Sequence, residues 1–122
     1  MEVVPYSFAG IPLLSLAGDF DHASAPSFAE EVDAVLDAGG SNLLLQLTDC
    51  PYIDSGGIGC LISSLRRVRD PGWLGVIAPH PDVLRVLKLV GLTVDPDFRV
   101  FSSLEEVQAY LQPPEATGAT SS

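Results

Sequence analysis

The sequence predicts an α/β domain with a mixed, mostly parallel sheet of about five strands, flanked by about four helices. Two observations predict this fold. Short apolar segments alternate with longer ones in which apolar residues recur every three or four positions, and turn residues separate them. Strands that alternate with helices favour parallel pairing through right-handed crossovers. The 122 residues leave room for one domain, expected over residues 1–112.

The first two strands are expected at residues 3–8 and 11–17. Ala9-Gly10 between them is a candidate two-residue turn, so the two strands form an antiparallel hairpin. Pro5 cannot donate to a strand ladder, which places the first strand at an edge of the sheet.

The first helix is expected to begin at Ser24 or Ala25, because a proline such as Pro26 is tolerated in a first turn. Gly39-Gly40 is typical of a helix end. The predicted buried stripe is Phe28, Val32, Val35 and Leu36, and the residues expected to face water are Glu30, Glu31, Asp33 and Asp37.

Residues 41–47 form a continuous apolar strand, which suits a sheet covered on both faces. The second helix is expected from about residue 56 to residue 69. Its apolar residues share one face: Ile58, Leu61, Ile62, Leu65 and Val68. Ser55 stands at the junction, where its hydroxyl is predicted to cap the helix by accepting a backbone N–H.

The remaining elements are a strand at 73–78, a helix beginning at 80–82, a short strand at 98–101 and a last helix that fades near residue 111. The third helix is expected to turn four residues inward: Val83, Val86, Leu87 and Val90. A serine followed three positions later by a glutamate, within residues 102–106, indicates a capping box. Residues 113–122 are expected to be a disordered tail.

The net charge of −10 is unevenly distributed along the chain. Nine acidic residues and no lysine or arginine precede Arg66, so the first half cannot form the basic patch that nucleic acid needs. This acidity favours a partner with a basic docking surface, or it only keeps the domain soluble.

No apolar run approaches the roughly 20 residues of a membrane span. The first residues lack the basic region of a signal peptide, so we expect a cytoplasmic protein without membrane association. Cys50 and Cys60 match neither a metal pair nor a CxxC motif, and two reduced thiols are expected.

Ser55 is the main functional clue, because its glycine neighbours predict a hydroxyl exposed at a loop tip. A phosphoserine carries about −1.5 to −2 charges. A helix start favours such a charge by roughly 0.3–1 kcal/mol. Phosphorylation of Ser55 is therefore expected to change docking and not folding. The alternative is an ordinary capping serine beside glycines that permit a tight turn.

The helix face opposite the apolar stripe is predicted to be a partner-binding surface. Its small residues would let another backbone approach closely. It carries Gly56, Gly59, Cys60, Ser63 and Arg67. Asp54 and, if the strand ends align, Asp21 and His22 are expected at the same rim, because α/β sites gather at the C-terminal ends of strands. Arg67 also fits a solvated helix end.

An enzyme is not expected, and no residue is assigned as catalytic. Asp-Ser-Gly-Gly at 54–57 also surrounds the nucleophile of trypsin-like proteases, but that chemistry needs an oriented histidine and a much larger body. The chain has two histidines, His22 and His80, and its serine is followed by a helical pattern.

No metal or cofactor is expected either. Asp19, Asp21 and His22 could suggest a metal cluster, but loop acids near a helix start usually cap or solvate it. The sequence contains neither a GxxxxGK[ST] loop nor a GxGxxG fingerprint.

The sequence resembles the STAS domain family, and in particular the bacterial anti-sigma factor antagonists. Residues 16–21 (LAGDFD) resemble the family's Leu-x-Gly-x-x-Asp, and residues 53–59 (IDSGGIG) its Asp-Ser-[Ser/Thr]-Gly-[Leu/Ile]-Gly signature. Residues 83–92 with 98–101 resemble its third helix and last strand. The resemblance implies a STAS-like domain, in which a mixed sheet is flanked by helices.

The resemblance also implies a function. In such antagonists the serine directly after the motif aspartate, here Ser55, is phosphorylated by the anti-sigma factor, an ATP-dependent serine kinase. The unphosphorylated antagonist binds that kinase and frees the sigma factor, and a PP2C-type phosphatase reverses the modification. Gly56 departs from the family's Ser or Thr. The alternative is a non-switching STAS scaffold or a soluble transporter-associated subunit.

Overall fold

The computed structural model describes residues 1–39, 41–68 and 71–112. Its strands are β1 (Glu2–Phe8), β2 (Ile11–Ala17), β3 (Leu43–Asp49), β4 (Leu74–Ile77) and β5 (Phe98–Phe101). Its helices are α1 (Ala25–Asp37), α2 (Ser55–Val68), α3 (Pro81–Leu89) and α4 (Leu104–Leu111), with a 3-10 turn η1 (Leu92–Val94). The predicted tail at 113–122 lies outside the described residues.

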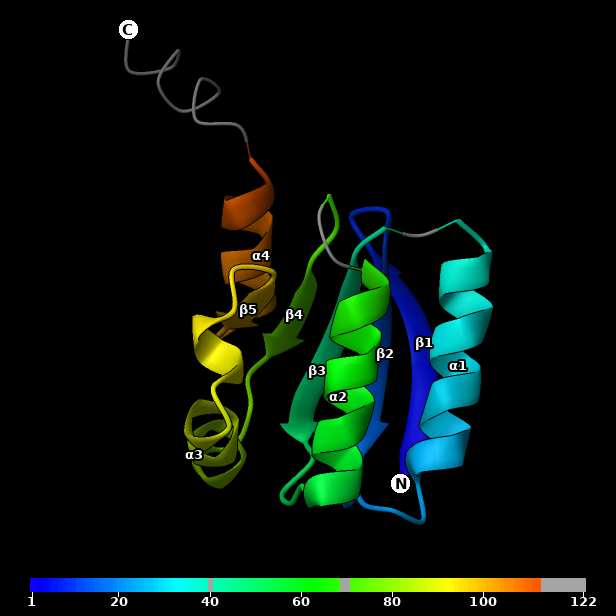
Figure 1. Ribbon diagram of the computed structural model, residues 1–122. Coiled ribbons are helices and arrows are strands. Elements are labelled where there is room, and N and C mark those ends of the chain that lie inside the picture. The colour runs from blue at the N-terminus through cyan, green and yellow to red at the C-terminus, as the bar shows by residue number, and fades with distance from the viewer. Residues whose placement is uncertain (40, 69–70, 113–122) are drawn as a thin grey trace, which may run out of the picture.

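The strands form one sheet in the order β1-β2-β3-β4-β5 (Figure 1). The β1–β2 pair is antiparallel and the following three pairs are parallel, which confirms the predicted fold class. Ala9 and Gly10 both have positive φ, as a type I′ hairpin turn requires, and Phe8 pairs with Ile11 across them. β1, with Pro5, lies at the edge as predicted.

One face of the sheet packs against α1, α2 and α3. In Figure 1, α2 lies in front of β2 and β3. Alternate strand residues point to this face, because side chains alternate along a strand. The strand residues of this core include Leu14, Leu16, Leu43, Leu45, Leu47 and Val76. The helices contribute Phe28, Val32, Leu61, Leu65, Val83 and Leu87, each nearly or fully buried. Burying a side chain of this size stabilises the fold by about 1.5–3 kcal/mol.

The other face of the sheet is covered only in part. Its buried cluster extends from Leu13 of β2 through Leu44 of β3 to Phe101 of β5, with Val107 of α4. Farther along β3, Gln46 is half-buried and Thr48 is exposed. The prediction of a sheet covered on both faces at 41–47 is therefore wrong for the end of this strand, because α4 is short and packs on β5.

Two helix ends give opposite outcomes. The capping box is confirmed: Ser103 Oγ accepts the Glu106 N–H at 3.2 Å, and the Glu106 carboxylate accepts the Ser102 N–H at 2.9 Å. Val90, predicted to point inward, is 49% exposed. The reason is that α3 ends at Leu89, and Gly91, at φ +84°, turns the chain so that Leu92 is buried instead.

Cys50 and Cys60 are both free, as predicted. In the described part of the chain no helix is long and apolar enough to cross a membrane.

Candidate functional site

Two loops that follow neighbouring parallel strands are joined to each other at one end of the domain. The Phe20 N–H donates to the Tyr52 carbonyl at 2.9 Å, and the Asp54 N–H donates to the Phe20 carbonyl at 3.1 Å. These bonds form an isolated parallel bridge between Phe20 and Ile53. The strand ends therefore align as expected, and the bridge brings Asp21 and His22 beside the start of α2.

Gly57 permits this close approach. A Cβ atom at position 57 would lie 2.5 Å from the Phe20 carbonyl oxygen and 2.6 Å from Cγ1 of Ile53. Both distances are well inside van der Waals contact, so the first turn of α2 reaches the loop only because this residue has no side chain.

Asp54, and not Ser55, caps α2. Asp54 Oδ1 accepts the N–H of Gly56 at 2.8 Å and the N–H of Gly57 at 3.2 Å, while the Asp54 carbonyl accepts the Ile58 N–H at 2.9 Å. The predicted capping role of Ser55 is wrong, because the helix begins one residue earlier than expected and Ser55 is its first residue. The sequence carried the signal for this cap, since aspartate is as good an N-cap as serine.

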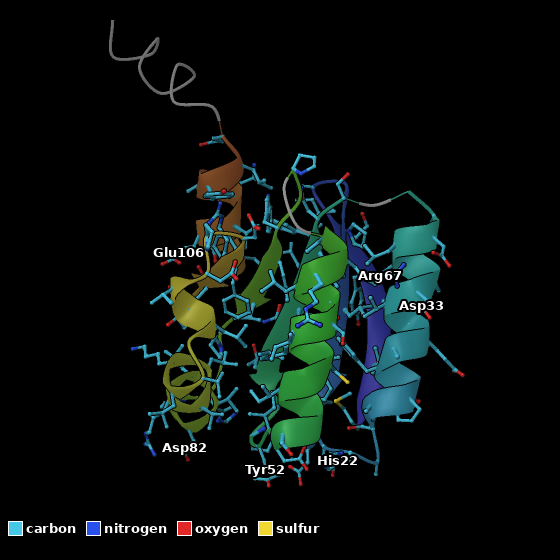
Figure 2. The ribbon with its side chains drawn as sticks, viewed as in Figure 1. His22, Asp33, Tyr52, Arg67, Asp82 and Glu106 are labelled. Carbon is cyan, nitrogen blue, oxygen red and sulfur yellow. The ribbon has the colours of Figure 1, made fainter. Side chains whose placement is uncertain are left out.

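Ser55 is exposed, as predicted. Its hydroxyl lies 3.3 Å from Nε2 of His22, in hydrogen-bond contact. Figure 2 shows His22 and Tyr52 at the end of the domain where α2 begins. The contact joins residues 33 positions apart, and the sequence placed the two side chains only at a common rim.

Gly56 is covered by the chain's own loop. A Cβ at position 56 would lie 2.7 Å from Nδ1 and 2.8 Å from the backbone nitrogen of His22. Gly59 differs, because a Cβ there would meet no atom within 4 Å. Of these two glycines in the predicted partner-binding set, Gly59 is the one open to solvent.

Asp21 is held within its own loop. Its Oδ1 accepts the Ser24 N–H and the Ser24 hydroxyl, each at 3.1 Å, and its N–H donates to Ser24 Oγ at 2.9 Å. The Ser24 N–H and then its hydroxyl lower the pKa of the Asp21 carboxyl, which keeps it ionised. The described residues contain no cluster of three or more acidic, histidine or cysteine side chains that could hold a metal ion.

A groove of about 350 Å³ runs between α1 and α2. It is lined from α2 by predicted partner-binding residues: Gly56, Gly59, Cys60, Ser63 and Arg67. Burial, and then the nearby Asp54 carboxylate, raise the pKa of the Cys60 thiol, which therefore remains protonated.

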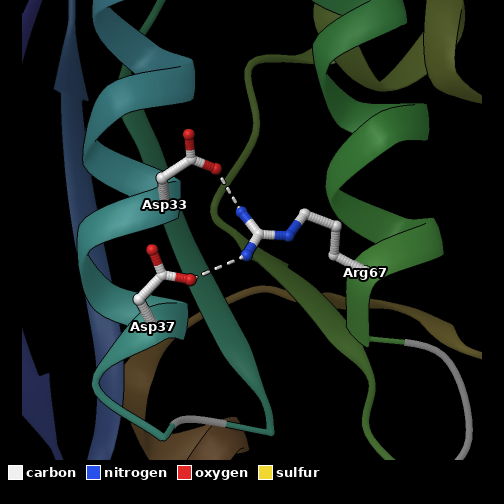
Figure 3. A network of polar contacts seen from close by, with 3 residues as sticks. All are labelled: Asp33, Asp37 and Arg67. Carbon is white, nitrogen blue, oxygen red and sulfur yellow. Dashed lines mark hydrogen bonds and ion pairs between the residues drawn. The ribbon is translucent and has the colours of Figure 1, made fainter.

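Arg67 connects the two helices that form the groove. Its guanidinium pairs with Asp33 and with Asp37 of α1, the latter at 3.3 Å (Figure 3). Both acids remain largely exposed, so the pairs contribute only about 0–1 kcal/mol each. The sequence missed this pairing, because Arg67 is 30 or more positions from either acid and only the packing of α1 on α2 brings them together.

Comparison with known proteins identifies the family. The sequence model of the STAS domain matches residues 4–107, most of the chain. The chain belongs to the STAS domain family. Its sheet with α1, α2 and α3 on one face is thus the STAS fold that the resemblance implied.

Several STAS proteins resemble this one. The anti-sigma-F factor antagonist RsfB of Mycobacterium tuberculosis is 27% identical over 97 residues, which cover 80% of this chain and 78% of RsfB. An anti-sigma factor antagonist from Mycobacterium paratuberculosis superposes with a TM-score of 0.79 at 20% identity, over 92% of this chain and 94% of that one. The Bacillus cell fate determinant SpoIIAA in its phosphorylated form gives 0.70 at 17% identity, over 91% and 100%.

The cap assignment predicts different effects for two adjacent residues. Asp54→Ala removes the acceptor for two backbone N–H groups and is expected to lower the free energy of unfolding by about 1 kcal/mol. Ser55→Ala removes an exposed hydroxyl that caps nothing and is expected to change it by less than about 0.5 kcal/mol. Urea denaturation of both variants measures the free energy of unfolding. Equal decreases in the two variants would contradict the assignment of the cap to Asp54 alone.

The loop contact predicts opposite effects for two glycines of α2. Gly57→Ala forces a methyl group against the Phe20 carbonyl and is expected to cost about 1–3 kcal/mol. Gly59→Ala adds a methyl group in open space and is expected to stabilise the domain by about 0.5–1 kcal/mol, because alanine favours the helix. Thermal denaturation compares them, and a stable Gly57→Ala variant would contradict the close approach.

Proposed function

We propose that this STAS domain is an anti-sigma factor antagonist that is switched by phosphorylation of Ser55. In the unphosphorylated state it binds an anti-sigma factor kinase and thereby releases the sigma factor. Phosphorylation of Ser55 ends that binding. The observation that carries the proposal is an exposed hydroxyl at the first residue of α2 that takes no part in capping the helix.

The proposed switch is supported by the separate roles of Asp54, which caps α2, and Ser55, which does not. Asp54 supplies the acceptor that α2 needs, so a phosphate on Ser55 replaces no capping bond. A negative group at a helix start is also favourable. The added charge therefore leaves the fold intact, and its effect is felt by whatever contacts the rim.

The phosphate opposes a second round of docking for an electrostatic reason. A kinase that has transferred its phosphoryl group and rebound ATP would bring the nucleotide phosphates against a phosphoserine of about −1.5 to −2 charges. The rim already carries Asp54 and Asp21, and removing such like charges from water together is costly.

The docking surface is proposed to follow α2 from Ser55 along Gly59 and Ser63, above the groove. Gly59 and Ser63 are exposed and small, so a partner backbone can approach the helix there. Gly56 and Cys60 are half-buried and line the groove below this surface, and the exposed Arg67 lies at its far end. The names of the relatives support an anti-sigma factor as partner, since they include anti-sigma factor antagonists.

Reversal of the switch requires removal of the phosphate. We propose a PP2C-type phosphatase as the second partner, because the exposed position of Ser55 leaves a phosphoester accessible. In this scheme the protein is a cytoplasmic binding module with no catalytic residue of its own.

Phosphoryl transfer is tested with an anti-sigma factor kinase and ATP, followed by intact-mass measurement. The wild type is expected to gain the mass of one phosphate, and Ser55→Ala is expected to gain none. Ser41→Ala is the matched control, because Ser41 is also exposed but precedes β3, at the opposite end of that strand from Ser55, and it is expected to react as the wild type. No mass gain, or equal gain by Ser55→Ala, removes the mechanism.

The switch predicts that Ser55→Asp weakens binding to the unmodified partner without unfolding the domain. Circular dichroism is expected to be unchanged, because a carboxylate in the first turn is compatible with the helix. Calorimetric titration is expected to show at least about a tenfold loss of affinity, which corresponds to about 1.4 kcal/mol. Undiminished affinity would favour a non-switching scaffold or transporter-associated subunit.

A further inference from the structure

His22 is the side chain that the fold places against the Ser55 hydroxyl. Its Nε2 lies 3.3 Å from Ser55 Oγ. The other edge of the ring lies over α2, where a Cβ at position 56 would be 2.7 Å from Nδ1 and 2.8 Å from Cγ. The imidazole therefore lies on the bare backbone of Gly56, with one nitrogen directed at Ser55.

The loop that carries His22 is fixed on both sides of it. On one side Phe20 is buried and forms the bridge to Ile53. On the other side the reciprocal bonds between Asp21 and Ser24 close the turn that leads into α1. These contacts hold the backbone of His22 beside the start of α2, although the ring itself is exposed.

The charges of the surrounding groups distinguish His22 from the other residues of the site. The acidic groups of the two joined loops are Asp54 before α2 and, on the loop before α1, Asp19 and Asp21. The positive charge of the Met1 amino group also lowers the pKa of the Asp21 carboxyl, and it is the smallest of the causes that act on this group. His22 is the group in hydrogen-bond contact with Ser55 that can carry a positive charge.

We propose that His22 is a positioning residue for the modification of Ser55, orienting the hydroxyl before phosphoryl transfer and binding the phosphate after it. This inference rests on the proposed function. Transfer forms the bond between Ser55 Oγ and the γ-phosphorus of ATP and breaks the bond from that phosphorus to the β,γ-bridging oxygen. ADP leaves, and the hydroxyl proton passes to a base of the kinase. His22 takes no proton in this step.

The phosphate formed in this way is held on the domain. The protonated imidazole and the phosphate dianion stabilise each other's charged forms. The bound phosphate then connects the start of α2 to the loop before α1, so modification changes the rim between the two helices as well as the charge of Ser55. Gly56 is part of this arrangement, because any larger residue there displaces His22.

The test is a ³¹P NMR titration of the full chain phosphorylated on Ser55, in the wild type and in His22→Ala. A phosphoserine titrates near about pH 6, and a positive partner favours the dianion. The midpoint in the wild type is therefore expected at least about half a pH unit below that in His22→Ala. Asp19, Asp21, Asp54 and the Met1 amino group are the same in both proteins, so the difference between the two midpoints reports His22.

Three further variants separate positioning from general effects on the fold. His80→Ala is the matched control, because His80 is also exposed at a helix start but contacts the Thr48 carbonyl; its midpoint should equal that of the wild type. His22→Ala is expected to slow phosphorylation of Ser55. His22→Gln keeps a hydrogen-bond donor without the charge, so it should be phosphorylated at the wild-type rate, while its phosphate should titrate with the midpoint of His22→Ala. Gly56→Ala should shift the midpoint toward that of His22→Ala.

The outcomes distinguish this inference from the proposed function. If the kinase does not modify the wild type, the proposed function fails, and phosphoserine placed at position 55 by genetic code expansion still allows the titration. Equal midpoints in the wild type and His22→Ala overturn the role of His22, whatever the kinase does. An equal shift in His80→Ala overturns it as well.

Discussion

The site depends on the contact between the Phe20 carbonyl group and the start of α2. The carbonyl group accepts the Asp54 N–H and occupies the space that a side chain at position 57 would need. Together with the bond from the Phe20 N–H to the Tyr52 carbonyl, this hydrogen bond and one missing Cβ join two loops that follow separate strands. Without this contact His22 would have no fixed relation to Ser55, and the start of α2 would not meet the loop before α1.

At the start of α2, one residue caps the helix and the next presents its side chain to solvent. Asp54 satisfies the backbone N–H groups of the first turn, and Ser55 presents its hydroxyl to solvent. If a single serine had served both purposes, a modification would break the bonds that hold the helix. Because the two tasks fall to adjacent residues, a charge added to Ser55 would leave the capping bonds in place, as the proposed switch requires.

The outer face of α2 beyond Ser55 is fixed in place by the core and by Arg67, and it is open to solvent at Gly59. Apolar residues fix the inner face of α2 in the core, and Arg67 connects its far end to α1 through two acids. Between these anchors Gly59 leaves bare backbone facing solvent. A partner that approaches there meets a preformed surface, so little conformational entropy is lost in ordering it.

The sequence by itself determined the local structure of this protein. The alternation of strands and helices, the hairpin at Ala9-Gly10 and the cap at Ser103 depend on residues close together in the chain. The tertiary structure decided that His22 covers Gly56, that Arg67 pairs with two acids of α1, and that α4 leaves part of the sheet open. These features depend on distances between elements remote in sequence, and such distances are set by packing, which residue patterns do not record.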